Sequence, residues 1–94
     1  MNLDKATKII AKKVKKGFQG YPEISLTYFG TTADNASEVV VGFILNEGDT
    51  AQEQKLTSAG DARQDETIQT TILKIIERAE AKTVLEADGV SIIQ

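Results

Sequence analysis

The sequence predicts an α+β fold, a two-layer sandwich in which two helices cover one face of an antiparallel sheet of three to five strands. Helical apolar periodicity occurs near the start and in the second half of the chain, and strand-like segments lie between these two regions. Clusters of Gly, Asp and Asn separate the segments. The expected order is α-β-β-β-α followed by one or two short strands. A chain of 94 residues suits one core, so we expect residues 1–94 to form a single domain.

The first helix is expected from Leu3 to Phe18. Apolar side chains recur there at steps of three and four residues, so they share one face. The members of this stripe are Leu3, Ala6, Ile10, Val14 and Phe18. Gly17 or Gly20 can end the helix, and Pro22 then favours an extended segment.

Three strands are expected next. The segment 23–29 alternates apolar and polar residues, and the polar loop 30–37 should turn the chain back. The segment 38–45 is apolar at positions of both parities. Val39, Val41, Phe43 and Leu45 should face one way, and Val40 and Ile44 the other. Apolar residues on both faces indicate a covered central strand or a face used in an interface. The polar segment 52–58 suits an edge strand.

The second helix is expected from Ala62 to Ala81, with Asp61 and Gln64 as a capping box. Its buried stripe should contain Ile68, Ile72, Ile75, Ile76 and Ala79. After this helix, the pair Asp88-Gly89 is typical of a two-residue hairpin turn. The segments on either side of that pair can therefore form two short terminal strands.

Charge is distributed unevenly along the chain. Residues 1–19 hold six lysines and one acid, whereas residues 20–94 hold five basic and thirteen acidic side chains. Such asymmetry creates a directional field that favours one kind of partner. We expect a docking face formed by Lys8, Lys12, Lys13, Lys15 and Lys16. We expect a second, apolar patch formed by Phe29, Val40 and Ile44.

The composition argues against most catalytic chemistry. The sequence contains no histidine and no cysteine, which excludes a Ser-His-Asp triad, a cysteine nucleophile and histidine-ligated zinc. The carboxylates of Asp61, Asp65 and Glu66 can share the start of a helix and hold a divalent ion, or they can cap the helix amides. Capping is the commoner role of acids at such positions, so we expect neither a metal nor a cofactor.

The element order resembles the double-stranded RNA-binding domain in outline. The resemblance spans about residues 3–81 and includes Pro22-Glu23-Ile24 at the start of the first strand. In that family, lysines at the start of the second helix contact phosphates. The corresponding place in this chain holds Asp61, Asp65 and Glu66 with Arg63, so the resemblance does not imply that mode of RNA binding.

These observations predict a small non-enzymatic binding domain that docks a protein partner or a second copy of itself. The alternative is nucleic-acid binding, with the lysines of the first helix on phosphates. We expect no membrane binding, because the apolar face of that helix is needed for the core. The opening residues lack the apolar run of a secretory signal, so we expect a cytoplasmic location.

Overall fold

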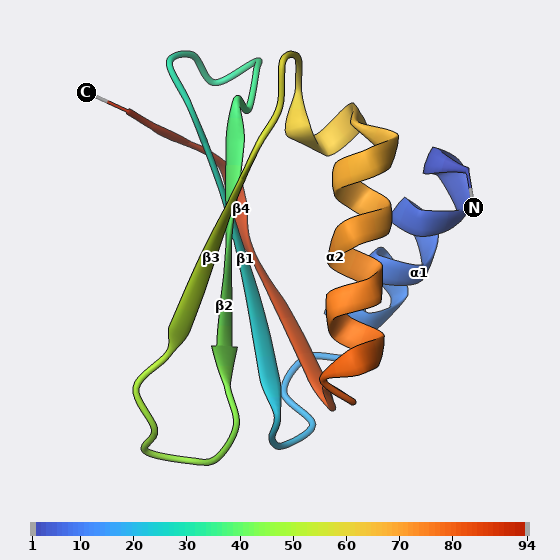
Figure 1. The fold of residues 1–94 in the computed structure, drawn as a ribbon, viewed down its shortest axis with the longest axis vertical. Coiled ribbons are helices and arrows are strands. Elements are labelled where there is room, and N and C mark those ends of the chain that lie inside the picture. The colour runs from blue at the N-terminus through green and yellow to red at the C-terminus, as the bar shows by residue number, and fades with distance from the viewer. Residues whose placement is uncertain (1, 94) are drawn as a thin grey trace.

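The computed structural model describes residues 2–93 and has two layers, with both helices on one face of the sheet (Figure 1). This arrangement is the predicted α+β sandwich. The elements are α1 (Leu3–Lys15), β1 (Glu23–Gly30), β2 (Glu38–Ile44), β3 (Gln52–Thr57), the 3₁₀ turn η1 (Ala62–Gln64), α2 (Glu66–Arg78) and β4 (Thr83–Ile92).

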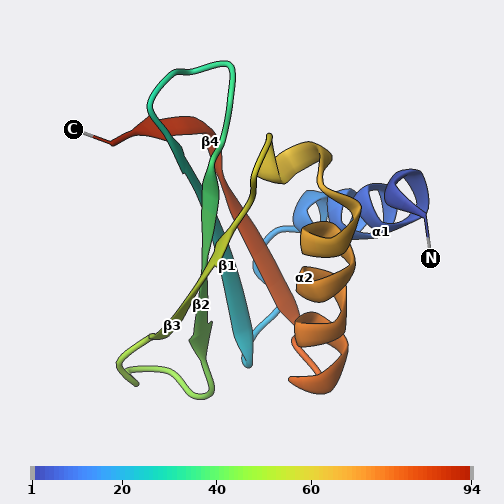
Figure 2. The ribbon, with the colours of Figure 1, turned by 45° about the horizontal axis from the view of Figure 1, so that its top comes forward.

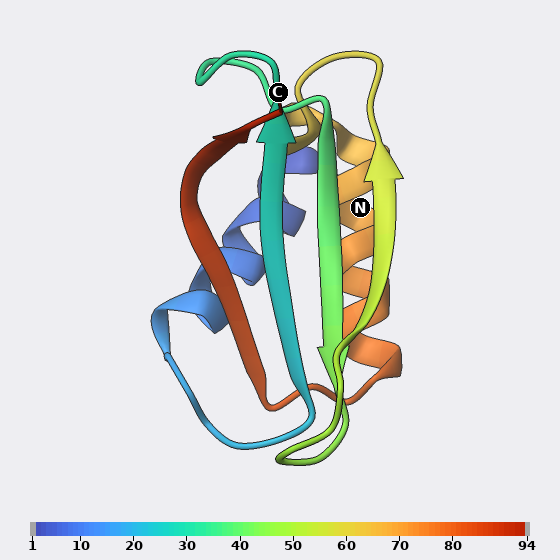
Figure 3. The same cartoon turned by 90° about the vertical axis from the view of Figure 1, so that its left-hand side faces the viewer.

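The sheet is mixed, which differs from the purely antiparallel sheet predicted. Its strand order is β3-β2-β1-β4, and β4 pairs with β1 in parallel while the other pairs are antiparallel (Figure 3). Helix α2 carries the chain back along the sheet, so β4 begins beside the start of β1. The amides of Lys82 and Thr83 donate to the Pro22 carbonyl there, at 2.9 and 3.3 Å.

The core lies between the helices and the sheet, and its strand residues follow the predicted alternation. Ile24, Leu26 and Tyr28 of β1 are at most 3% exposed and point toward the helices with Val39 and Val41 of β2. The helices contribute Ala6, Ile10, Ile68, Ile72, Leu73 and Ile76 to the same cluster. The two helices also cross each other, as the turned view shows (Figure 2).

Two apolar residues predicted to be buried are exposed. Helix α1 ends at Lys15, one turn earlier than predicted, and Gly17 then adopts a positive φ of 70°. Phe18 therefore lies outside the helix, is 58% exposed and packs edge-on against Tyr21, with ring centroids 5.4 Å apart. Leu45 is 53% exposed because β2 ends one residue before it.

The predicted second helix is divided into two parts. The backbone forms η1, becomes extended at Asp65, and resumes as α2. Asp61 caps η1 by accepting from the Arg63 amide, and Asp65 caps α2 by accepting from the Ile68 amide at 3.1 Å. Each carboxylate satisfies an amide that lacks a partner within its own helix, so each segment has its own start.

The prediction of a hairpin at Asp88-Gly89 is wrong. Strand β4 is continuous, and its register against β1 shifts within the strand. Leu26 pairs with Glu86, but Tyr28 pairs with Val90, so β4 has two extra residues over this interval. Gly89 has a positive φ of 66° in this bulge, a conformation that hairpin turns also use.

Candidate functional site

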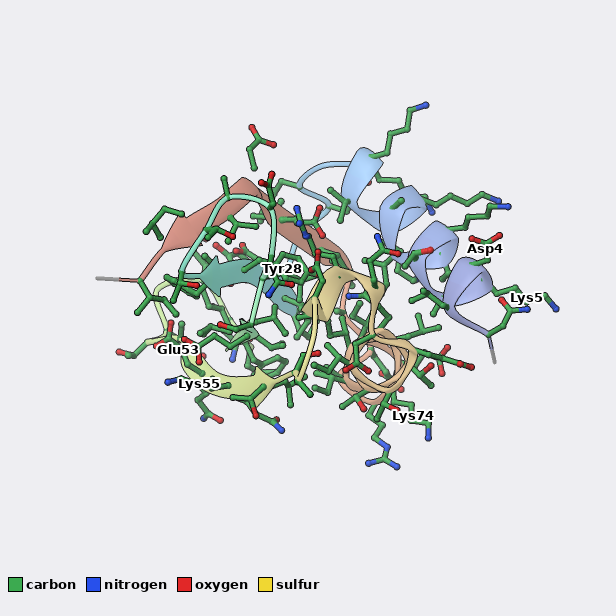
Figure 4. All side chains as sticks on the ribbon, turned by 90° about the horizontal axis from the view of Figure 1, so that it is seen from above. Asp4, Lys5, Tyr28, Glu53, Lys55 and Lys74 are labelled. Atoms are coloured by element: carbon green, nitrogen blue, oxygen red, sulfur yellow. The ribbon has the colours of Figure 1, made fainter. Side chains whose placement is uncertain are left out.

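Helix α1 presents a strip of lysines on the side opposite its buried residues. Lys8, Lys12, Lys15 and Lys16 are all exposed, whereas Ala6 and Ile10 are buried. At 3.6 residues per turn these four lysines share the solvent face, and we call them the lysine strip. Figure 4 shows the neighbouring Lys5 pointing into solvent at the start of the helix. Lys13, which the sequence placed in the same docking face, is partly buried at the edge of the strip.

The charge of the lysine strip is largely uncompensated within the molecule. Among the described residues, Lys8 is the one member of the strip that lies within 4.0 Å of a carboxylate, at 3.9 Å from Asp4. Both side chains of this pair are more than three-quarters exposed, so the pair contributes little stability. Lys12 and Lys15 also lie in the last turn of α1, where positive charge complements the helix dipole. A part of the strip therefore has a structural role.

The three residues of the predicted apolar patch lie on the face of the sheet away from the helices. Phe29, Val40 and Ile44 have the opposite parity to the core residues of their strands, and all three are partly buried. Val40 is paired with Thr27, so it lies diagonally from Phe29. Ile44 lies four residues further along β2 and is paired with Glu23. Phe29 and Val40 are therefore neighbours, and Ile44 lies apart from them.

Two of the three acidic residues at the start of the second helix cap backbone amides. Asp61 bonds Arg63 through both carboxylate oxygens, at 3.1 Å to Nε and 2.9 Å to Nη2, and this guanidinium lowers the pKa of Asp61. Asp65 accepts from the Ser58 hydroxyl at 2.8 Å and from the Ile68 amide, and these bonds lower its pKa. Glu66 is exposed in the first turn of α2. Within residues 2–93, no three acidic side chains gather closely enough to hold a metal ion.

A cavity that the sequence did not predict lies between α1, the start of α2 and the bulge of β4. Its volume is about 430 Å³, and we call it the Tyr28 cavity. Its polar wall contains Tyr28, Arg63, Gln69 and Glu86, and its apolar wall contains Leu3, Ile10, Ala11 and Ala87. An apolar wall that faces several polar groups can hold a small molecule that has both polar and apolar parts.

Gln69 and Tyr28 form a hydrogen-bonded pair at this wall, although each is only 3% exposed. Gln69 Nε2 donates to the Tyr28 hydroxyl at 2.9 Å and to the Ala62 carbonyl at 3.0 Å. A carbonyl can only accept, so the amide nitrogen of Gln69 must face Ala62. Burial raises the pKa of Tyr28, so its hydroxyl keeps its proton at neutral pH.

The regular part of β4, just before its bulge, places Glu86 at the same cavity. Glu86 pairs with Leu26, whose side chain is in the core, so the Glu86 side chain also projects toward the helices. Partial burial, and then the nearby charge of Asp88, raise the pKa of Glu86. Leu3 and Ile10 were expected from the sequence in the apolar stripe of the first helix, whereas Gln69 and Glu86 were not singled out. The sequence feature that indicates this polar wall is Gln69, a polar residue within the apolar stripe of Ile68, Ile72 and Ile76.

Comparison with known proteins gives no relative from which a function can be transferred. No protein-family model, no curated protein and no solved structure matches the chain. No helix among the described residues is long and apolar enough to cross a membrane.

Proposed function

We propose that the chain is a non-enzymatic, cytoplasmic binding domain that docks an acidic protein surface through the lysine strip of α1. The observation that carries the proposal is the segregation of charge in space. Four exposed lysines share one helix face and have one weak internal partner, while the rest of the molecule is acidic. Like charges on one face repel each other, and an acidic partner relieves this repulsion.

The absence of histidine and cysteine from the sequence supports a role in binding. Two of the three clustered acids at the second helix are already engaged as caps, and the third is exposed. The acidic body of a second copy of the chain meets the same chemical requirement as an acidic partner. Contact between the strip of one copy and the body of another would be heterologous. Phe29 and Val40 on the open sheet face offer a further surface for such self-association.

Nucleic-acid binding is the second candidate, because the same lysines can contact phosphates. It differs from protein docking in its salt dependence, since each phosphate contact releases counterions. Helix α1 has no aromatic side chain on which bases can stack, and Phe18, which is exposed two residues after Lys16, already packs against Tyr21. We therefore rank the acidic protein surface first.

The test is a backbone NMR titration of the chain with a ten-residue glutamate peptide and, separately, with short RNA and DNA duplexes. Each titration is run at low and at physiological salt. We expect the peptide to shift the amides of α1 and to retain measurable binding at physiological salt. The variant Lys12→Glu/Lys16→Glu should abolish these shifts, whereas Lys74→Glu/Lys82→Glu, an equal charge change outside α1, should retain them.

Three outcomes overturn the docking of an acidic protein surface. Shifts with the duplexes alone, fading steeply as salt rises, transfer the assignment to nucleic acid. Shifts that survive the α1 double variant, or no shift with any probe at low salt, remove the lysine strip as a binding face. Sedimentation of the free chain at increasing concentration, with both double variants, then tests self-association.

A further inference from the structure

We propose that the Tyr28 cavity binds a small organic amine, with the ammonium group at Glu86 and a short apolar portion against the wall formed by α1. This site uses residues that do not belong to the lysine strip, so it is independent of the docking proposal.

The buried polar pair leaves one donor and one acceptor for a ligand. Both hydrogen bonds of the Gln69 side chain use Nε2, so Gln69 Oε1 retains its capacity to accept. The Tyr28 oxygen accepts one of these bonds, so its own proton remains available to donate. Both side chains line the cavity and are 97% removed from solvent. Groups held so rigidly by the fold orient a ligand at little entropic cost.

The charges at the cavity favour a cation. The positive charge among the lining residues belongs to Arg63, and Asp61 neutralises it through two bonds to the guanidinium. The Asp34 carbonyl accepts a further bond from Arg63 Nη2 at 3.1 Å, so this guanidinium is held in place. Glu86 has no hydrogen bond or ion pair of this kind within residues 2–93, and the other carboxylate of the lining, Asp4, has only the exposed pair with Lys8 at 3.9 Å. The lining residues therefore present net negative charge to a ligand.

The size and apolar wall limit the ligand further. A volume of about 430 Å³ lies in the range of small-molecule pockets, roughly 300–1,000 Å³. Leu3, Ile10 and Ala11 form an apolar surface on α1, opposite the strand that carries Glu86. An ammonium group alone would leave this surface in contact with water. An amine that also has a short hydrocarbon or aromatic portion fills both parts of the cavity.

The test uses three probes of nearly equal shape and different charge: phenethylamine, its neutral analogue 2-phenylethanol, and the anion 3-phenylpropanoate. Each is titrated into the full ¹⁵N-labelled chain and followed by NMR. We expect phenethylamine to shift the Gln69 side-chain amide and the amides of Ala87 and Gly89. We expect it to bind at least five-fold more tightly than either of the other probes.

Glu86→Gln is the decisive variant, because it preserves size and removes the charge of an exposed residue. It should weaken phenethylamine binding by about five- to ten-fold and leave 2-phenylethanol unchanged. Glu77→Gln, which makes the same charge change on the exposed part of α2, should leave both unchanged and so controls for the net charge of the chain.

Three results overturn the proposal: equal binding of the neutral or anionic probe, shifts confined to residues outside the cavity, or equal effects of the two variants. None of these results depends on the lysine strip, so the two proposals fail separately.

Discussion

Removing the hydrogen bond between Tyr28 and Gln69 should have an effect whose size follows from the structure. Gln69→Leu eliminates two buried bonds, of 2.9 and 3.0 Å, and leaves the Ala62 carbonyl without this donor. At about 0.5–1.5 kcal/mol net for each bond, the loss is about 1–3 kcal/mol. Tyr28→Phe eliminates one of the two bonds and should cost about 1 kcal/mol. For a domain of this length, 1 kcal/mol lowers Tm by about 4–8 °C.

The double variant Tyr28→Phe/Gln69→Leu distinguishes a real pair from two independent residues. The bond between the two side chains is lost in either single variant, so the double variant should cost little more than Gln69→Leu alone. The expected coupling is about 1 kcal/mol, measured by urea unfolding followed by circular dichroism at constant m. Gln64→Leu, at an exposed position of η1, should change stability by less than about 0.5 kcal/mol. Additive costs would refute the paired arrangement, and so would a Gln69→Leu variant as stable as the parent chain.

Three further changes test other parts of the structure. Asp65→Ala should cost about 1–2 kcal/mol through loss of the α2 cap. The pKa of Asp65 is lowered in the fold, so its stabilisation is present above about pH 4 and is lost as pH falls; the variant and parent should converge in acid melts. Glu86→Gln should raise Tm at pH 7, because the raised pKa means that folding disfavours the charged form, and this gain should vanish at pH 3, where the carboxyl is protonated in both states. Gly30→Ala should cost about 1–3 kcal/mol in chemical unfolding, since a Cβ there overlaps the Asn35 carbonyl, whereas Gly60→Ala, with open space around it, should be nearly neutral.

The layers of the fold follow from patterns that are local in the sequence. The alternation of Ile24, Leu26 and Tyr28 determines which face of β1 is buried, whatever its partners are. The spacing of Leu3, Ala6 and Ile10, first three and then four residues, does the same for α1. The lysine strip was predictable for the same reason, since its four members fall on the side that these buried residues leave free. Whether the strip binds a partner stays a prediction.

Element ends and strand direction were less predictable, because they depend on contacts distant in sequence. Phe18 continues the periodicity of α1, but the chain turns at Gly17 and brings the Gln19 amide to the Thr83 hydroxyl at 2.7 Å. Asp88-Gly89 has the composition of a hairpin turn, and a glycine at positive φ serves a bulge equally well. Pairing of both halves of β4 with β1 decides between the two. The local sequence of residues 83–92 does not distinguish a hairpin turn from a bulge.

The Tyr28 cavity illustrates why a site is harder to predict than the fold that holds it. Its polar wall requires three separate features: the break between η1 and α2, the placement of Gln69 over β1, and the pairing of β4 with β1 that directs Glu86 toward the helices. Only the placement of Gln69 is indicated by the sequence, because this glutamine lies within an apolar stripe. A buried amide must find partners, so that glutamine indicates a buried acceptor on the facing sheet. The hydroxyl of Tyr28, on the alternating apolar face of β1, was the side chain able to meet that requirement. This part of the wall can thus be inferred from a sequence pattern. The pattern is a polar residue within the buried stripe of a helix, together with a tyrosine on the buried face of a strand.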